Sequence, residues 1–80
     1  MYMIKTFYNC RLNGLDGLFE KLEDAKSAIE NNKFDLSENG TNDTVIIQEI
    51  QFGVYPEGRI LYLYEWNRAK ECYEGGPYYD

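Results

Sequence analysis

The chain has 80 residues, the size of one small domain, and 44% of them are hydrophobic, which is enough to form a core. Fourteen Asp and Glu residues against eight Lys and Arg residues give a formal net charge of -6. Nucleic acid and anionic membranes repel an acidic surface, so both are disfavoured as direct partners. The charge is compatible with a protein partner that has a basic surface, or with no role beyond solubility.

Two features predict a cytoplasmic protein. No apolar run approaches the ~20 residues that span a bilayer. The segment from Met1 to Ile4 has neither the basic start nor the apolar stretch of a signal peptide. Cys10 and Cys72 are therefore expected to be reduced, although they could pair if the fold brings them together.

The N-terminal segment, Tyr2–Leu12, is predicted to form the first strand. Its apolar residues are spread over both faces, which suits an antiparallel sheet with one covered face and one face in water. The dipeptides Asn13-Gly14 and Asp16-Gly17 are typical of turns and are expected to end the strand. The apolar residues around them are expected to fold back beside the start of a helix: Leu15, Leu18 and Phe19.

A helix is predicted over Leu22–Asn32, because apolar residues recur there at helical spacing. Leu18, Leu22, Ala25 and Ile29 are separated by four, three and four residues, which places them on one face. The first turn is acidic, as the positive end of a helix dipole favours. The polar residues that follow, from 34 to 43, are predicted to form a loop.

The strongest pattern is a hairpin of two strands, Thr44–Phe52 and Arg59–Trp66. β-Branched and aromatic residues dominate both segments, and they fit a pleated surface better than a helix. Pro56 and Gly58 are suited to the turn between the strands. Beyond the hairpin, Glu74–Asp80 is predicted to be a flexible tail, since two glycines and a proline disfavour both helix and strand.

These elements predict an α+β fold (βαββ) with one helix packed on a three-stranded antiparallel sheet. A helical crossover leaves the two strands that it joins running the same way. The last strand would lie between them, which gives the sheet order 1-3-2 and leaves one sheet face open. Residues 1–73 would form a single domain, and residues 74–80 the tail.

The chemical inventory predicts a protein that is not an enzyme. The chain has no histidine, no glycine-rich phosphate loop with a lysine, and no serine in a nucleophile setting. Two cysteines without histidine do not build the usual closed zinc site, so no metal or cofactor is predicted.

One loop resembles the start of a calcium-binding EF-hand loop, with oxygen-bearing residues and a glycine at the expected spacing. Ile46 stands where that loop needs a bidentate Glu, and a strand follows instead of a helix. An ordinary polar loop is the favoured interpretation. A calcium or small-ligand sensor is the weaker alternative, and it would use Asp35, Asn39 and Asp43.

Tyrosine is unusually frequent, with eight residues in 80, and several lie near the C-terminus. Tyrosine combines apolar area with a polar tip and is favoured at protein interfaces. Trp66 is expected to belong to the core, whereas the last three tyrosines are expected at the surface. With the carboxylates around them, they complete the predicted partner-binding residues: Glu23, Glu30, Tyr64, Glu65, Glu71, Tyr73, Glu74, Tyr78 and Tyr79.

As an architecture, this plan resembles small acidic proteins of phages and mobile elements, including some anti-CRISPR proteins. The resemblance covers Tyr2–Leu12, Leu22–Asn32 and Thr44–Trp66. It implies a non-enzymatic protein-binding module that inhibits a nucleic-acid-handling complex by docking on its basic groove. The alternative is a self-associating structural module that forms a homodimer through Thr44–Phe52 as an exposed edge strand.

Overall fold

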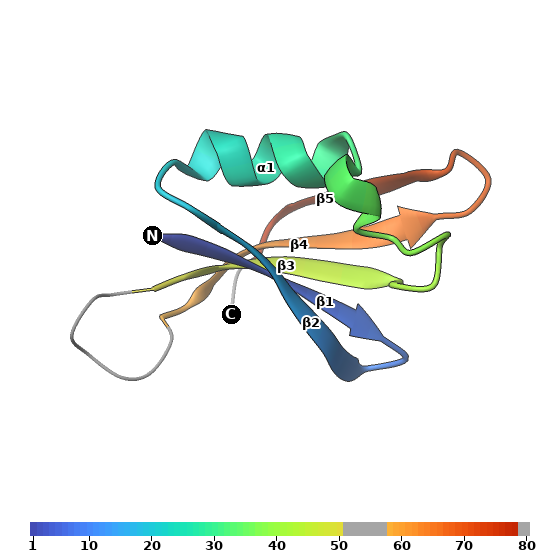
Figure 1. Ribbon diagram of the computed structural model, residues 1–80, viewed down its shortest axis with the longest axis horizontal. Coiled ribbons are helices and arrows are strands. Elements are labelled where there is room, and N and C mark those ends of the chain that lie inside the picture. The colour runs from blue at the N-terminus through green and yellow to red at the C-terminus, as the bar shows by residue number, and fades with distance from the viewer. Residues whose placement is uncertain (51–57, 79–80) are drawn as a thin grey trace.

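The computed structural model describes residues 1–50 and 58–78. These residues form one antiparallel sheet with a single short α-helix lying across one of its faces (Figure 1). In chain order the elements are β1 (Tyr2–Tyr8), β2 (Arg11–Phe19), α1 (Leu22–Glu30), a 3-10 turn η1 (Lys33–Asp35), β3 (Thr44–Glu49), β4 (Ile60–Asn67) and β5 (Cys72–Pro77).

The prediction of a three-stranded sheet with the order 1-3-2 is wrong. The sheet has five strands in the order β2-β1-β3-β4-β5. The helical crossover does join two strands that run the same way, but these are β2 and β3, and β1 lies between them as the antiparallel partner of both. The predicted hairpin pairing is confirmed in the described residues, where β3 pairs antiparallel with β4. Most of its predicted turn lies outside them.

The additional N-terminal strand arises from a tight turn inside the segment predicted as one strand. Asn9 and Cys10 connect β1 to β2, and both have positive φ angles, of 50° and 67°. Positive φ at both central residues is the pattern of a two-residue hairpin turn whose twist matches the strands. The residues expected to fold back at the helix start, including Leu15 and Leu18, therefore lie in β2.

The fifth strand, β5, includes residues 74–77 of the segment that was predicted to be a flexible tail. Glu71 turns the chain with a positive φ of 54°, and Cys72–Pro77 then pairs with β4 along its whole length. Pro77 is tolerated because β5 is an edge strand and Pro77 is its last residue. The backbone N–H of Tyr78 still bonds to the carbonyl of Leu61, so the sheet extends beyond the predicted domain boundary.

The core lies between α1 and one face of the sheet. The helix buries Ala25, Ala28 and Ile29 against sheet residues that include Ile4, Val45, Ile47, Tyr64 and Tyr73. Ala25 and Ile29 were predicted on this face and Leu18 was not placed correctly, because it belongs to β2. The helix ends at Glu30, two residues earlier than predicted, and Asn32 follows in the left-handed conformation.

Gly75 permits the close approach of β5 to β4. A Cβ atom at this position would lie 2.1 Å from the carbonyl oxygen of Leu63 and 2.7 Å from the Cα of Tyr64. These are backbone atoms, so neither can move aside as a side chain could. A Cβ atom at the neighbouring Gly76 would meet nothing within 4 Å.

We therefore expect Gly75→Ala to destabilise the protein by about 2 kcal/mol, the usual cost of forcing extra atoms into a packed structure. For a domain of this size, that loss lowers the melting temperature by about 10 °C. Gly76→Ala is the matched control and should change the stability by less than about 0.5 kcal/mol. Thermal unfolding followed by circular dichroism measures both variants, and equal melting temperatures would show that the β4–β5 contact is looser than described.

Candidate protein-binding surfaces

The predicted partner-binding residues do not form one surface. Glu23 and Glu30 are exposed on α1, Glu65 and Glu74 on β4 and β5, and Glu71 in the turn between those strands. Tyr78 is 40% exposed. Tyr64 and Tyr73, by contrast, are only 3% and 5% exposed, so the expectation of a surface position for Tyr73 is wrong, while the binding role of both residues stays a prediction. Tyr79 lies outside the described residues.

Tyr64 lies under α1, where its hydroxyl faces a carboxylate of the helix. The hydroxyl donates a long hydrogen bond of 3.5 Å to Glu30. Burial, followed by the charge of Glu30, raises the pKa of Tyr64 to about 12. Its ring packs in a stack with that of Tyr62, 6.3 Å between centroids, and Lys26 of α1 lies 4.8 Å above the Tyr62 ring. Tyr62 and Tyr64 of β4 therefore both contact the helix.

Tyr73 fixes the loop that precedes β3. Its hydroxyl donates a 2.8 Å hydrogen bond to the backbone carbonyl of Asn42, and the Asn42 side chain in turn donates to the carbonyl of Leu36. Burial raises the pKa of Tyr73, and the negative charges of nearby carboxylates raise it further; these are Asp35, Asp43, Asp16 and Glu38. Trp66 packs edge-on against Tyr73, with 4.9 Å between ring centroids, and so belongs to the edge of the core.

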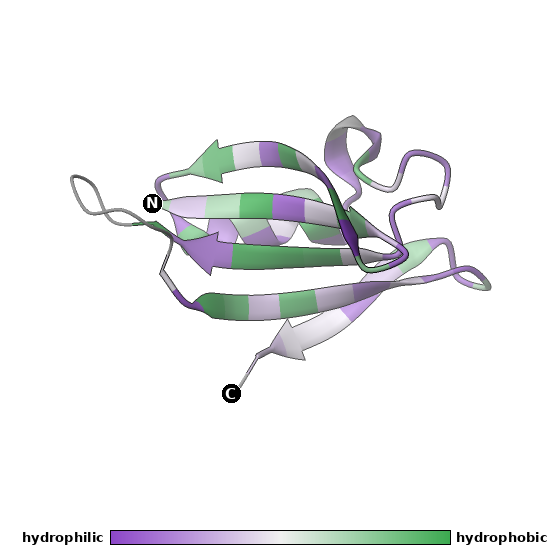
Figure 2. Ribbon diagram, turned by 90° about the horizontal axis from the view of Figure 1, so that it is seen from below, coloured by the Kyte–Doolittle hydropathy of each residue, from purple (hydrophilic) through white to green (hydrophobic). Residues whose placement is uncertain are grey.

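The sheet face opposite α1 was predicted to be open, but the apolar residues that it carries were not predicted there. Residues that pair directly across strands point to the same side, so the register defines its rows. One row runs from Leu15 through Lys5 and Ile46 to Leu63, and parallel rows begin with Leu12 beside Phe7 and with Leu18 beside Met3. Figure 2 looks onto this side of the sheet, and α1 lies behind it. We name these residues the leucine face: Met3, Lys5, Phe7, Leu12, Leu15, Leu18, Ile46 and Leu63.

Two irregularities in the β1–β2 pairing place the three leucines on one side. The register skips Asp16 and Asn13, so each is an extra residue in β2, and a spacing of three then returns to the same face. Both extra residues make hydrogen bonds. Asp16 accepts one from Thr6, and Asn13 donates to Asn42 and Glu38. The spacing of the leucines was visible in the sequence, but without the bulges it does not suggest a strand.

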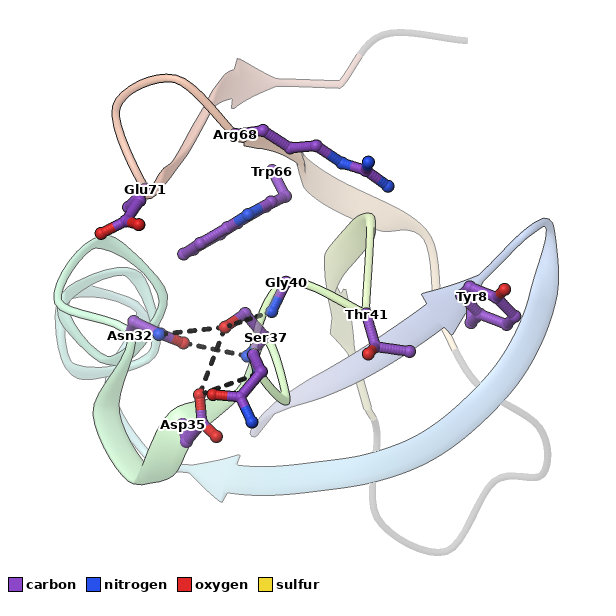
Figure 3. A pocket seen from close by; sticks show the side chains of 10 residues that line it. Tyr8, Asn32, Asp35, Ser37, Gly40, Thr41, Trp66, Arg68 and Glu71 are labelled. Carbon is purple, nitrogen blue, oxygen red and sulfur yellow. Dashed lines mark hydrogen bonds between the residues drawn. The ribbon is translucent and has the colours of Figure 1, made fainter.

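A pocket of about 660 Å³ opens at the end of the sheet, between the β4–β5 turn and the loop after α1 (Figure 3). Its lining is polar and aromatic and includes Tyr8, Asp35, Thr41, Trp66, Arg68 and Glu71.

The floor of this pocket is a loop that is bonded to itself. Asn32 and Ser37 exchange hydrogen bonds, and one carboxylate oxygen of Asp35 accepts from Ser37 and from the backbone of Asn39. Gly40, with a φ of 83°, brings the loop up to Trp66, because a Cβ atom there would lie 3.0 Å from the indole nitrogen. The loop is therefore shaped before anything binds.

The same loop is the one that resembles the start of a calcium-binding EF-hand loop. One oxygen of Asp35 serves the loop's own hydrogen bonds, and Asp43 accepts from the backbone of Asn9 and from Thr44. In residues 1–50 and 58–78, no group of three or more His, Cys, Asp or Glu side chains is arranged to hold a metal ion.

In comparisons with known proteins, no protein-family model, no curated protein and no solved structure matches the chain. Among the described residues, no helix is long and apolar enough to cross a membrane.

The hydrogen bond from Tyr73 to Asn42 yields a stability prediction. Tyr73→Phe removes the donor and leaves a buried carbonyl unpaired, so we expect a loss of about 1–2 kcal/mol. Tyr62→Phe is the control, because the Tyr62 hydroxyl has no hydrogen-bond partner among the described residues, and it should cost less than about 0.5 kcal/mol. Urea unfolding of both variants provides the comparison, and an equal loss would exclude a special role for this bond.

The raised pKa of Tyr64 predicts a loss of stability at alkaline pH. The unfolded chain releases this proton near pH 10 and the folded chain near pH 12, so the folded state holds more protons between these values. The stabilisation is complete below pH 10 and is lost as the pH rises through about 12. Tyr64→Phe should therefore show a shallower fall in unfolding free energy over this range. A slope equal to that of the unsubstituted protein would contradict the assignment.

Proposed function

We propose that this chain is a non-enzymatic protein-binding module and that the leucine face is its interface. One observation carries the proposal: Leu12, Leu15 and Leu18 point to the same side of the sheet and are 56%, 62% and 57% exposed. Single exposed leucines are common, but a contiguous apolar surface on a small protein is typical of a site that another protein covers. No other described helix or strand lies over this face (Figure 2).

The charge distribution supports the same surface. Charged residues make up 28% of the chain, yet in the rows that define the face they are limited to Lys5 near the centre and Glu65 and Glu74 at one end. Glu74 is also bridged to Lys70 at 3.1 Å. Lys5 is only 7% exposed, so the charge that the face presents to solvent lies at its rim, as in protein interfaces.

The size of the face sets the expected strength of binding. The leucine face covers four strands, and strands about 4.8 Å apart and about six residues long give it a size of ~19 by ~20 Å. That area is below the ~800 Å² per partner of a standard interface, so the face alone supports a weak or transient complex. A tighter complex needs contacts outside the leucine face.

The narrower prediction, an inhibitor that docks on a basic nucleic-acid-binding complex, stays a prediction. The net charge of -6 and the exposed carboxylates of Glu23, Glu30 and Glu71 support it. A cytoplasmic location is supported by the two unpaired thiols, Cys10 and Cys72. The alternative of a homodimer through an exposed Thr44–Phe52 strand is wrong in its geometry, because β3 is paired on both sides and the edges are β2 and β5.

A photo-crosslinking amino acid at Leu15 tests the proposal in cells of the source organism. We expect one discrete protein adduct from Leu15 and none from the same amino acid at Asp24, which is exposed on α1. Leu18→Lys should abolish the adduct. With the partner in hand, Leu15→Lys should weaken binding by at least about 30-fold, since burial of the leucine is lost and a charge must be desolvated.

Two results would count against a heterologous partner at this face. Equal adducts from Leu15 and Asp24, or no adduct from Leu15, would remove the leucine face as the interface. An adduct with twice the mass of the chain would favour the self-associating module, with the face in place of the predicted edge strand.

A further inference from the structure

We propose that the pocket at the end of the sheet is a second binding site, and that it receives a cationic side chain, arginine or lysine, from a basic peptide segment of a protein partner. The site is separate from the leucine face, and it does not depend on the function proposed for that face. Its volume of about 660 Å³ exceeds what one side chain needs, so the neighbouring peptide backbone fits as well.

The aromatic part of the pocket is held in place. Trp66 lies in the middle of the lining in Figure 3, packed edge-on against buried Tyr73 and close against Gly40. The face of an indole ring attracts cations through its quadrupole, most strongly among the aromatic side chains. Tyr8, which is 53% exposed, adds a second ring at the other side of the pocket.

The carboxylates of the pocket favour a cation over an anion. Glu71 is exposed and has no hydrogen bond or ion pair within the described residues, and the Oδ2 atom of Asp35 is likewise without one. Glu71 is carried by a backbone with a φ of 54°, at the end of the turn beside Trp66. Asp35 also helps to raise the pKa of Tyr73, the residue against which Trp66 packs; burial is the main cause, and Asp43, Asp16 and Glu38 contribute as well.

Arg68 is the one cation among the described residues that line the pocket. It lies beside Trp66 in Figure 3 and forms no ion pair with any residue that the structure describes. Two carboxylates outweigh its charge, so the lining stays net negative. Arg68 is therefore a competitor for the incoming cation, and its removal should strengthen binding.

Trp66 is the only tryptophan in the chain, so its fluorescence reports on the pocket directly. The full chain is titrated with three capped peptides of equal length: triarginine, triglutamine and triglutamate. We expect a saturable change with triarginine alone. Glu71→Gln should weaken this binding about fivefold, as expected for one partly exposed charge contact. Arg68→Gln should strengthen it.

Glu74→Gln is the matched control, because Glu74 carries the same charge three residues away, does not line the pocket and pairs with Lys70. It should leave the affinity for triarginine unchanged. Equal weakening by Glu71→Gln and Glu74→Gln would mean general attraction to an acidic protein and would overturn the site. A saturable response to triglutamate would also overturn the site. So would the absence of a saturable response to triarginine in a protein that circular dichroism shows to be folded.

Discussion

The register of β2 against β1 is the constraint on which the rest of the structure depends. β1 is paired on both sides, with β2 and with β3. It therefore joins the strand before the helix and the strand after it into one sheet. The two extra residues in β2, Asn13 and Asp16, send their polar side chains to the helix side and leave the leucines on the other. Without them, the leucines would alternate between the core and water.

The buried tyrosines have the role that polar side chains often have in small cores, which is to fix a loop as well as to fill space. Tyr73 bonds the carbonyl of Asn42, and Asn42 bonds both Leu36 and Asn13. This chain of contacts ties β5, the loop before β3 and β2 together. The high tyrosine content is therefore explained in part by packing, since a buried hydroxyl needs a partner and finds one in an irregular loop.

Much of the regular structure could be predicted from the sequence, and the irregular part could not. The helix and the two central strands follow from side-chain periodicity, which is a local property. The turn at Asn9 and Cys10 lacks the glycine that usually marks positive φ, so the first strand was extended through it. β5 was not predicted because glycines are unfavourable inside a strand. In the fold, however, Gly75 is required by its close contact with Leu63, a residue twelve positions away. Both failures concern positions at which tertiary contacts override local preference.

The same limit explains why the binding surface was predicted to be acidic and rich in tyrosine. Composition gives the net charge of -6 but not its distribution, and the fold separates an almost uncharged face from an acidic pocket. Consecutive residues of a strand point to opposite sides, so Phe7 lies on the leucine face while Tyr8 lines the pocket, and Glu65 and Trp66 divide in the same way. The two surfaces therefore lie back to back at one end of the sheet. A compact partner can cover one of them, and only a partner that wraps around this end, or two different partners, can occupy both.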